Sequence, residues 1–267
     1  MVDLTALLAD LAAESEQLDA LVAALPPEAW DRPTPAPGWT VAHQIAHLAW
    51  TDHVAHLAAT DTDAFYASIT SAPDPSRLVD DGAEQFLAPP GDLLARWRAG
   101  RAALAGALAA VPPGGKLPWY GTSMSATSMA TARIMETWAH GEDVADALGV
   151  TRTPTGRLRH IAYLGFRTLG HSFAAHGRAV PTTPVRVELT APDGDTWALG
   201  PADAADRVTG PALDFCLLVT QRRHRADLAL VATGPTADAW LDVAQAFAGP
   251  PGAGRAPGAG REAGAPA

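Results

Sequence analysis

The chain has 267 residues, of which 48% are hydrophobic, and its 19 basic and 29 acidic side chains give a net charge of −10. This size and composition are typical of one large or two modest globular domains, and they exclude a largely disordered protein. The acidic balance argues against nucleic acid or an anionic membrane as the main partner.

The sequence contains one cysteine, Cys216, within the apolar run LDFCLLV. A disulfide framework and a thiolate metal cage are therefore both excluded, and a buried thiol that packs as a small hydrophobic group is the simplest interpretation. The first residues, MVDLTALLADLAAESEQ, are acidic where a secretory signal needs basic side chains, and no apolar stretch reaches the length of a membrane span. We therefore expect a cytoplasmic protein that has no membrane segment.

The first half of the chain has the apolar spacing of helices. Thr40 is a suitable N-cap for the second helix and Asp92 for the third, whereas Gly149 suits the end of the fourth. Residues 60–91 contain the breakers SAPDPS and APPGD, so we expect this connection to be irregular. Four amphipathic helices with a long second connection predict a four-helix bundle. The expected helices lie over about 4–25, 41–59, 93–111 and 129–149.

After the segment TRTPTG the pattern changes to a mixture of helices and strands. We expect a helix over 156–177, then the strand VRVELT, a PDGD turn and a returning strand. The helix ALDFCLLVTQRR, the strand LALVATG and the helix TADAWLDVAQAFAG should follow. We therefore predict an α+β protein with a four-helix bundle over 1–150 and a smaller α+β domain over 151–248. The low-complexity residues 249–267 should form a disordered tail.

Two segments of the predicted bundle carry side chains that suit a metal ion. METWAHGEDV places Glu136 and His140 four residues apart, on one face of a helix. GWTVAHQIAHLAW does the same for His43 and His47, either of which could supply a third ligand from a facing helix. Two histidines and one carboxylate suit zinc with an open position, and they suit iron(II) as well. The same spacing is also common on ordinary solvated helix faces.

Together, these segments resemble the DinB-like family, in particular the actinobacterial branch that includes mycothiol-dependent maleylpyruvate isomerase. The stretch GWT at 38–40 matches the family's opening of helix two, and His47 matches its first metal ligand. Glu136 and His140 match the Glu-x-x-x-His of helix four. The resemblance covers the predicted bundle and implies that His47, Glu136 and His140 bind a divalent metal, with zinc favoured. His43 has no ligand role in the family pattern.

The second half resembles the smaller α+β domain that follows the bundle in that isomerase. The family places an arginine directly after an apolar helix, facing the metal, and Arg222 in FCLLVTQRR matches this position. Arg223 and Arg225 are close alternatives, and Gln221 stands where the family usually has glycine. The resemblance implies that the arginine holds a substrate carboxylate through a two-pronged contact. The alternative is an exposed basic helix end.

The resemblance also implies a reaction. Mycothiol, a small thiol, would bind the metal as a thiolate and serve either the isomerisation of a small electrophilic substrate or its S-conjugation. The sequence offers no nucleophile elbow, which fits a nucleophile supplied from outside the chain. Two alternatives stay open: a non-catalytic metal-containing protein that binds a small ligand, and a metal-dependent enzyme that acts through metal-bound water. The expected partner is a small-molecule substrate, and no oligomeric state follows from the sequence.

Overall fold

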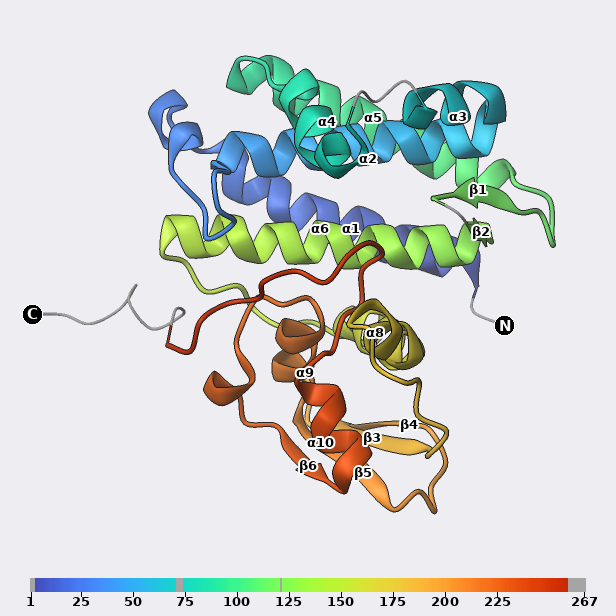
Figure 1. Ribbon diagram of the computed structural model, residues 1–267. Coiled ribbons are helices and arrows are strands. Elements are labelled where there is room, and N and C mark those ends of the chain that lie inside the picture. Colours follow the sequence, from blue (N-terminus) through green and yellow to red (C-terminus); the bar gives the residue numbers. More distant parts are fainter. Residues whose placement is uncertain (1–2, 71–73, 121, 259–267) are drawn as a thin grey trace, which may run out of the picture. The chain divides into compact units, whose positions relative to one another are not determined.

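The computed structural model describes residues 3–70, 74–120 and 122–258 (Figure 1). The chain divides into two compact units, Met1–Val150 and Thr151–Ala267. The fold is α+β, as the sequence predicts, because the first unit is mostly helical and the second contains a small sheet. No described helix is long and apolar enough to cross a membrane.

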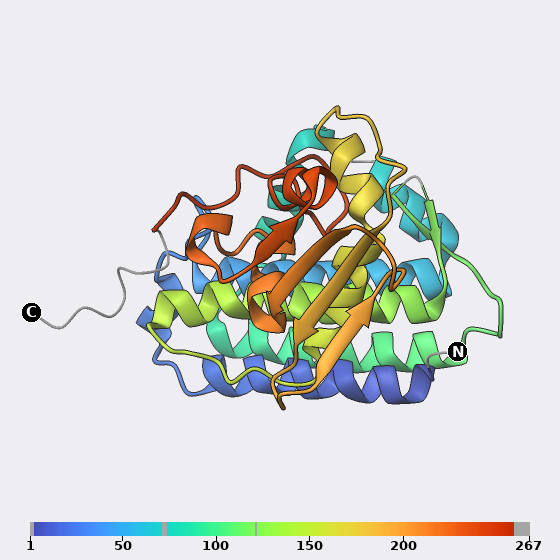
Figure 2. The same cartoon turned by 90° about the horizontal axis from the view of Figure 1, so that it is seen from below.

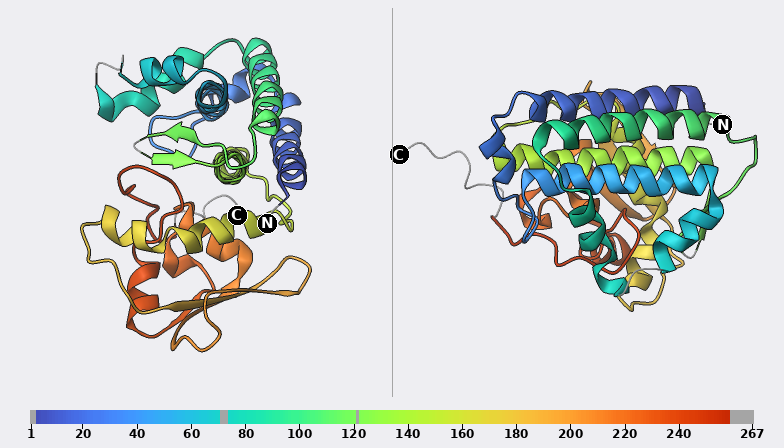
Figure 3. Two further views of the ribbon diagram at one scale, coloured as in Figure 1. Left: turned by 90° about the vertical axis from the view of Figure 1, so that its right-hand side faces the viewer. Right: turned by 90° about the horizontal axis from the view of Figure 1, so that it is seen from above.

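Four long helices lie side by side in the first unit (Figures 1 and 3). Their apolar faces meet in two buried clusters, one around Leu104 and Met129 and the other around Ile45 and Trp97. The second of these helices contacts four neighbouring helices, which explains why it is buried around most of its circumference. The predicted four-helix arrangement is therefore confirmed. The helices are α1 (Leu4–Ala23), α2 (Val41–Thr60), α5 (Pro90–Ala110) and α6 (Ala126–Leu148).

The expectation that residues 60–91 are irregular is wrong. Two helices form there. Gly82, on the second of them, allows close packing against α2, since a Cβ at this position would lie 2.3 Å from Trp50 Cε2. The start of the third predicted helix is also wrong, since α5 begins at Pro90, and proline suits the first turn of a helix. The additional helices are α3 (Thr62–Thr70) and α4 (Leu78–Phe86), with a 3₁₀ turn, η2 (Pro75–Arg77), before α4; another, η1 (Pro27–Asp31), follows α1.

The segment that leads into α6 forms an antiparallel hairpin of β1 (Leu117–Trp119) and β2 (Thr122–Met124), where the sequence predicts a loop. The hydroxyl of Ser125 caps α6 by accepting the N–H of Ser128. At the other end, Gly149 has a φ of +67°, a left-handed conformation that glycine adopts without strain. The predicted end of this helix is therefore confirmed.

The second unit is built around a four-stranded sheet with the order β4-β3-β5-β6, drawn in orange and red in Figure 2. β3 and β5 are parallel, and the other neighbouring strands are antiparallel. Of the two central strands, β3 corresponds to the predicted VRVELT strand, and β5 is a strand that the sequence analysis did not predict. The strands are β3 (Val185–Thr190), β4 (Thr196–Leu199), β5 (Asp206–Pro211) and β6 (Val231–Thr233).

The helix predicted over 156–177 is divided at Thr168, whose hydroxyl donates to the carbonyl group of Gln245 over 2.7 Å. The last predicted helix ends early, at Leu241. Beyond it, residues 249–258 form no helix or strand, although Gly258 N–H donates to Asp227, and residues 259–267 of the predicted tail lie outside the described part of the chain. The helices of this unit are α7 (Leu158–Arg167), α8 (Leu169–Ala175), α9 (Ala212–Val219) and α10 (Pro235–Leu241), with a 3₁₀ turn, η3 (Arg225–Asp227).

Candidate metal centre

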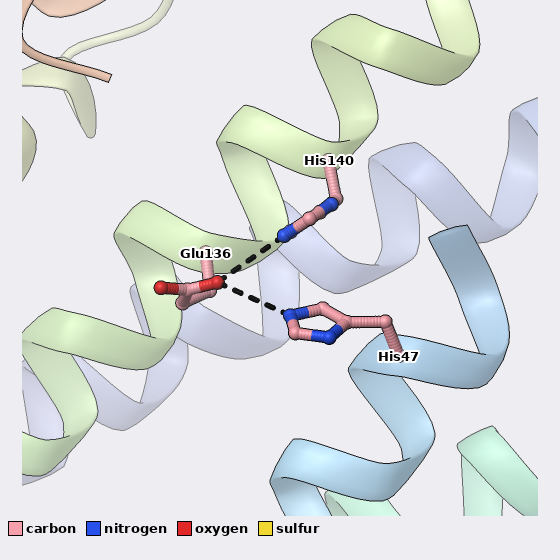
Figure 4. A group of neighbouring side chains, drawn as sticks. All are labelled: His47, Glu136 and His140. Atoms are coloured by element: carbon pink, nitrogen blue, oxygen red, sulfur yellow. Dashed lines mark ion pairs between the residues drawn. The ribbon is translucent and has the colours of Figure 1, made fainter. Parts of the chain in front are cut away.

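Three side chains that the sequence singles out as metal ligands converge in the first unit (Figure 4). His47 comes from α2, and Glu136 and His140 come from successive turns of α6. Glu136 Oε2 lies 3.5 Å from His47 Nε2 and 3.3 Å from His140 Nε2. Ligand atoms bound at about 2.0–2.1 Å around a tetrahedral zinc ion are about 3.3–3.4 Å apart. The two separations from Glu136 therefore match edges of a tetrahedral site, and all three ligand atoms lie within 4.8 Å of one another.

The surroundings of His47 also suit a metal ligand. The residue is 6% exposed, and within the described residues neither of its ring nitrogens has a hydrogen-bond partner. Buried polar groups are nearly always satisfied in folded proteins, so an imidazole left in this state points to a ligand. The Nε2 atom faces Glu136, at a distance too long for a hydrogen bond. A cation between the two would satisfy both groups.

The charge of Glu136 is set by its two histidine neighbours. Burial raises the pKa of this carboxyl, but the neighbouring imidazoles of His140 and His47 outweigh burial and hold the pKa well below its usual value. Glu136 is therefore a carboxylate at neutral pH. Two imidazoles and one carboxylate form a donor set that zinc and iron(II) both accept.

The sequence analysis did not predict a chain of hydrogen bonds that begins at Nδ1 of His140. The Nδ1 atom of His140 is hydrogen-bonded to Oε1 of Gln44, which is fully buried on α2. Gln44 Nε2 donates to Thr34 Oγ1 over 2.8 Å, and that hydroxyl donates to the carbonyl of Trp39 over 2.9 Å. Glutamine inside a helix carries no chemical signature of its own. The one available signal was its spacing, three residues before His47 and hence on the same helical face.

Trp39 covers the two histidines. Its ring centroid lies 5.2 Å from that of His47 and 6.0 Å from that of His140. The indole Nε1–H donates to Asp80 on α4 over 3.0 Å, which fixes the ring in this position. The sequence marked Trp39 only as part of a family motif, and its contact with Asp80 joins the loop before α2 to a helix that the sequence did not predict.

His43 lies one turn before His47 but does not join the ligand cluster. Its Nδ1 atom accepts the backbone N–H of Thr40 over 3.3 Å and lies 2.8 Å from the Thr40 hydroxyl. The two residues form a capping box at the start of α2. His43 therefore stabilises the helix end, in agreement with the absence of a ligand role.

A buried ion pair joins the two ligand-bearing helices. Arg133 on α6 donates through Nε to Asp52 on α2 over 2.9 Å, and through Nη2 to Thr51 over 2.7 Å. The Thr51 hydroxyl in turn donates to the carbonyl of His47 over 2.9 Å. Because Arg133 lies one turn from Glu136, this network fixes the register of α6 against α2 at the level of the ligands.

The predicted arginine belongs to the second unit. Arg222 is half-buried directly after α9, and its Nη1 donates to the carbonyl of Thr220. Gln221 has a φ of +58°, and the N–H groups of Gln221 and Arg222 bond to the carbonyls of Leu218 and Leu217. This is the helix-ending motif in which glycine is the usual residue, which accounts for the glycine in the family pattern.

The two neighbouring arginines differ in their contacts. Arg225 is held by two carboxylates, those of Asp238 and Asp242. Arg223 donates to the backbone carbonyl of Arg222. Two acidic groups already occupy the guanidinium of Arg225, which makes it a weak candidate for holding a substrate carboxylate.

Comparisons with known proteins identify the family to which most of the first unit belongs. The family model described as mycothiol maleylpyruvate isomerase N-terminal domain matches residues 11–145, and a model described as wyosine base formation matches residues 181–233. Two uncharacterized proteins of Mycobacterium tuberculosis, from strains CDC 1551 / Oshkosh and ATCC 25618 / H37Rv, are each 57% identical over 257 residues. The match covers 96% of this chain and 100% of each relative.

The fold is also found among solved structures. The crystal structure of a mycothiol-dependent maleylpyruvate isomerase superposes with a TM-score of 0.58 at 15% identity, over 88% of this chain and 96% of that one. A variant of that enzyme with a histidine replaced by alanine gives the same values. At this identity, the likeness establishes a shared fold.

Proposed function

This chain belongs to the mycothiol maleylpyruvate isomerase N-terminal domain family, and on that premise we propose that it is a metal-dependent enzyme that uses mycothiol. The reaction would be isomerisation or S-transfer on a small electrophilic substrate. The observation that carries the proposal is the convergence of His47, Glu136 and His140, with both histidine nitrogens at distances from Glu136 that suit a tetrahedral site. We assign zinc to these residues, with iron(II) as the alternative.

A divalent ion held by these residues would lower the pKa of a thiol bound in the open fourth position, so that the thiol reacts as a thiolate at neutral pH. The chain's own residues favour this. With two neutral imidazoles, Glu136 supplies the only ligand charge, so that the occupied site keeps a net charge of about +1 and attracts an anion. Trp39 covers both imidazoles and limits the access of water to them.

The chain itself offers no suitable thiol. Cys216, the one cysteine of the sequence, is fully buried in α9, and its Sγ donates to the carbonyl of Leu158. In the proposed reaction, the nucleophilic sulfur therefore belongs to a second small molecule. Mycothiol is the thiol named in the family description, which supports its role as cosubstrate.

We further propose that Arg222 binds a carboxylate of the substrate. Its place directly after α9, at the position that the family resemblance indicates, supports this choice. A planar guanidinium suits a carboxylate because it can donate two parallel hydrogen bonds. Arg222→Lys keeps the charge but loses this geometry, so it should raise KM for a carboxylate substrate more than it changes kcat.

The direct test is turnover of maleylpyruvate and related electrophiles by the zinc-loaded protein, with and without added mycothiol. We expect thiol-dependent turnover that is absent in Glu136→Ala, because that variant lacks the charged ligand. Turnover that needs no thiol would instead support a reaction through metal-bound water. Tight binding of small ligands without any turnover would support a non-catalytic binding protein.

A further inference from the structure

We propose that Gln44 is the positioning residue of the metal centre, which fixes how the imidazole of His140 faces the metal. The inference rests on the proposed metal site and adds a residue that neither the family pattern nor the ligand spacing identifies. α2 would then supply both a ligand, His47, and the partner of a ligand on α6. The two residues lie three positions apart on α2, so they share one face of the helix.

The direction of each hydrogen bond in this chain follows from its last acceptor, the carbonyl oxygen of Trp39. The carbonyl oxygen of Trp39 can only accept, so the hydroxyl of Thr34 donates to it. That hydroxyl therefore presents a lone pair to Gln44, and only the amide nitrogen of Gln44 can donate to it. The amide oxygen of Gln44 must then face His140. Because the oxygen is an acceptor, Nδ1 of His140 must carry the hydrogen.

This arrangement leaves the opposite nitrogen of His140 for the metal. With the hydrogen on Nδ1, neutral His140 presents the lone pair of Nε2 toward Glu136, 3.3 Å away. Gln44 is fully buried and bonded at both ends of its amide, so it holds the ring in one orientation. A second acceptor, Asp143 Oδ2, lies 3.9 Å from the same nitrogen, beyond hydrogen-bond distance. We therefore assign the orienting role to Gln44, which is within hydrogen-bond distance.

Outer partners of this kind matter for binding strength. Removing the group that holds a metal-ligating histidine lowers metal affinity about 10- to 100-fold in proteins. Gln44→Leu keeps the approximate size of the side chain and removes the acceptor, so we expect a loss in this range for zinc. Gln44→Glu keeps an acceptor for His140, so we expect it to stay within a few-fold of the wild type.

The experiment measures zinc affinity by competition with a chromophoric chelator for the wild type, Gln44→Leu and Gln44→Glu. Proton and ¹⁵N spectra of the zinc-loaded proteins, labelled at histidine, report the Nδ1–H of His140 directly. We expect a downfield, slowly exchanging Nδ1–H resonance in the wild type and in Gln44→Glu, and its loss or rapid exchange in Gln44→Leu. Asp143→Asn is the matched control and should keep the resonance. Circular dichroism of each metal-free variant checks that the bundle still folds.

The outcomes separate this inference from the proposed function. If the wild type binds no zinc, the proposed metal centre fails, and the positioning role fails with it. If the wild type binds zinc and Gln44→Leu binds it equally well with an unchanged Nδ1–H resonance, only the positioning role is overturned. The same holds if Asp143→Asn, and not Gln44→Leu, abolishes the resonance.

Discussion

The indole of Trp39 stacks on the imidazole of His140, with ring centroids 6.0 Å apart and 22° between the planes. Trp39 is held in this position by Asp80, a residue of α4. The ligand on α6 therefore depends on the loop before α2 and on a helix in the long connection. This contact extends the candidate metal centre beyond its three proposed ligands.

Removing the indole should weaken the site. We expect Trp39→Ala to lower zinc affinity about 10-fold or more, because both histidines lose a wall that limits their motion and hydration. Trp39→Phe keeps an aromatic ring but loses the bond to Asp80, so its effect should be smaller. Chelator competition measures both affinities. Wild-type zinc affinity in Trp39→Ala would refute a role for the stacking.

The packing of α4 on α2 should be sensitive to a single methyl group. In Gly82→Ala the added Cβ would lie 2.3 Å from Trp50 Cε2, so the indole must move. Overpacking of this kind costs about 1–3 kcal/mol. Because the Trp50 ring lies 6.0 Å from that of His47, zinc affinity should also fall. Thermal unfolding of the metal-free protein and chelator competition measure the two effects.

The control for this substitution is Gly100→Ala on α5, where an added Cβ meets no atom within 4 Å. This change should stabilise the helix by up to about 1 kcal/mol, because alanine has the higher helix propensity. A Gly82→Ala protein as stable as Gly100→Ala would show that Trp50 can adapt without cost.

Helical spacing and family resemblance led to His47, Glu136 and His140, because ligand chemistry restricts such positions to a few residue types. The partners of these ligands were not predictable in the same way. Gln44 and Asp80 act through tertiary contacts, and no local pattern distinguishes them from other polar residues. The helix α4 was missed because it lies between the breakers SAPDPS and APPGD, which the sequence analysis took as signs of an irregular connection.

Gln221 adopts a left-handed conformation that favours glycine. Gln221→Gly should therefore stabilise the second unit by about 0.5–1 kcal/mol, after allowance for the greater freedom of glycine in the unfolded chain. Gln221→Ala removes the same side chain but keeps the Cβ, so it should give no such gain. Thermal unfolding compares the variants. Equal stability of the glycine and alanine variants would show that the conformation carries no strain.

Asp19 should make the free energy of unfolding of the bundle depend on pH. Hydrogen bonds from Arg98, together with the charges of Arg98 and Arg101, hold its pKa below the usual value of 3.8 against the opposing effect of burial. An acid with a lowered folded-state pKa stabilises the fold above its unfolded pKa and loses this contribution as the pH falls through the folded value.

We therefore expect Asp19→Asn to be less stable than the wild type at pH 7 by about 1 kcal/mol, since Arg98 is partly exposed and solvent weakens the pair. The difference should shrink below about pH 4. Urea unfolding of the metal-free proteins at pH 7 and at pH 3 measures this difference in stability. A difference that stays constant down to pH 3 would mean that Asp19 acts through its shape and not through its charge.

The central claim, that α2 and α6 meet around a metal ion, is tested most directly by elemental analysis of the purified wild type and of His47→Ala after loading and desalting. The account predicts about one zinc or similar divalent ion per wild-type chain and almost none in His47→Ala, with circular dichroism showing that both are folded. Equal metal content in the two proteins, or none in the loaded wild type, would contradict it.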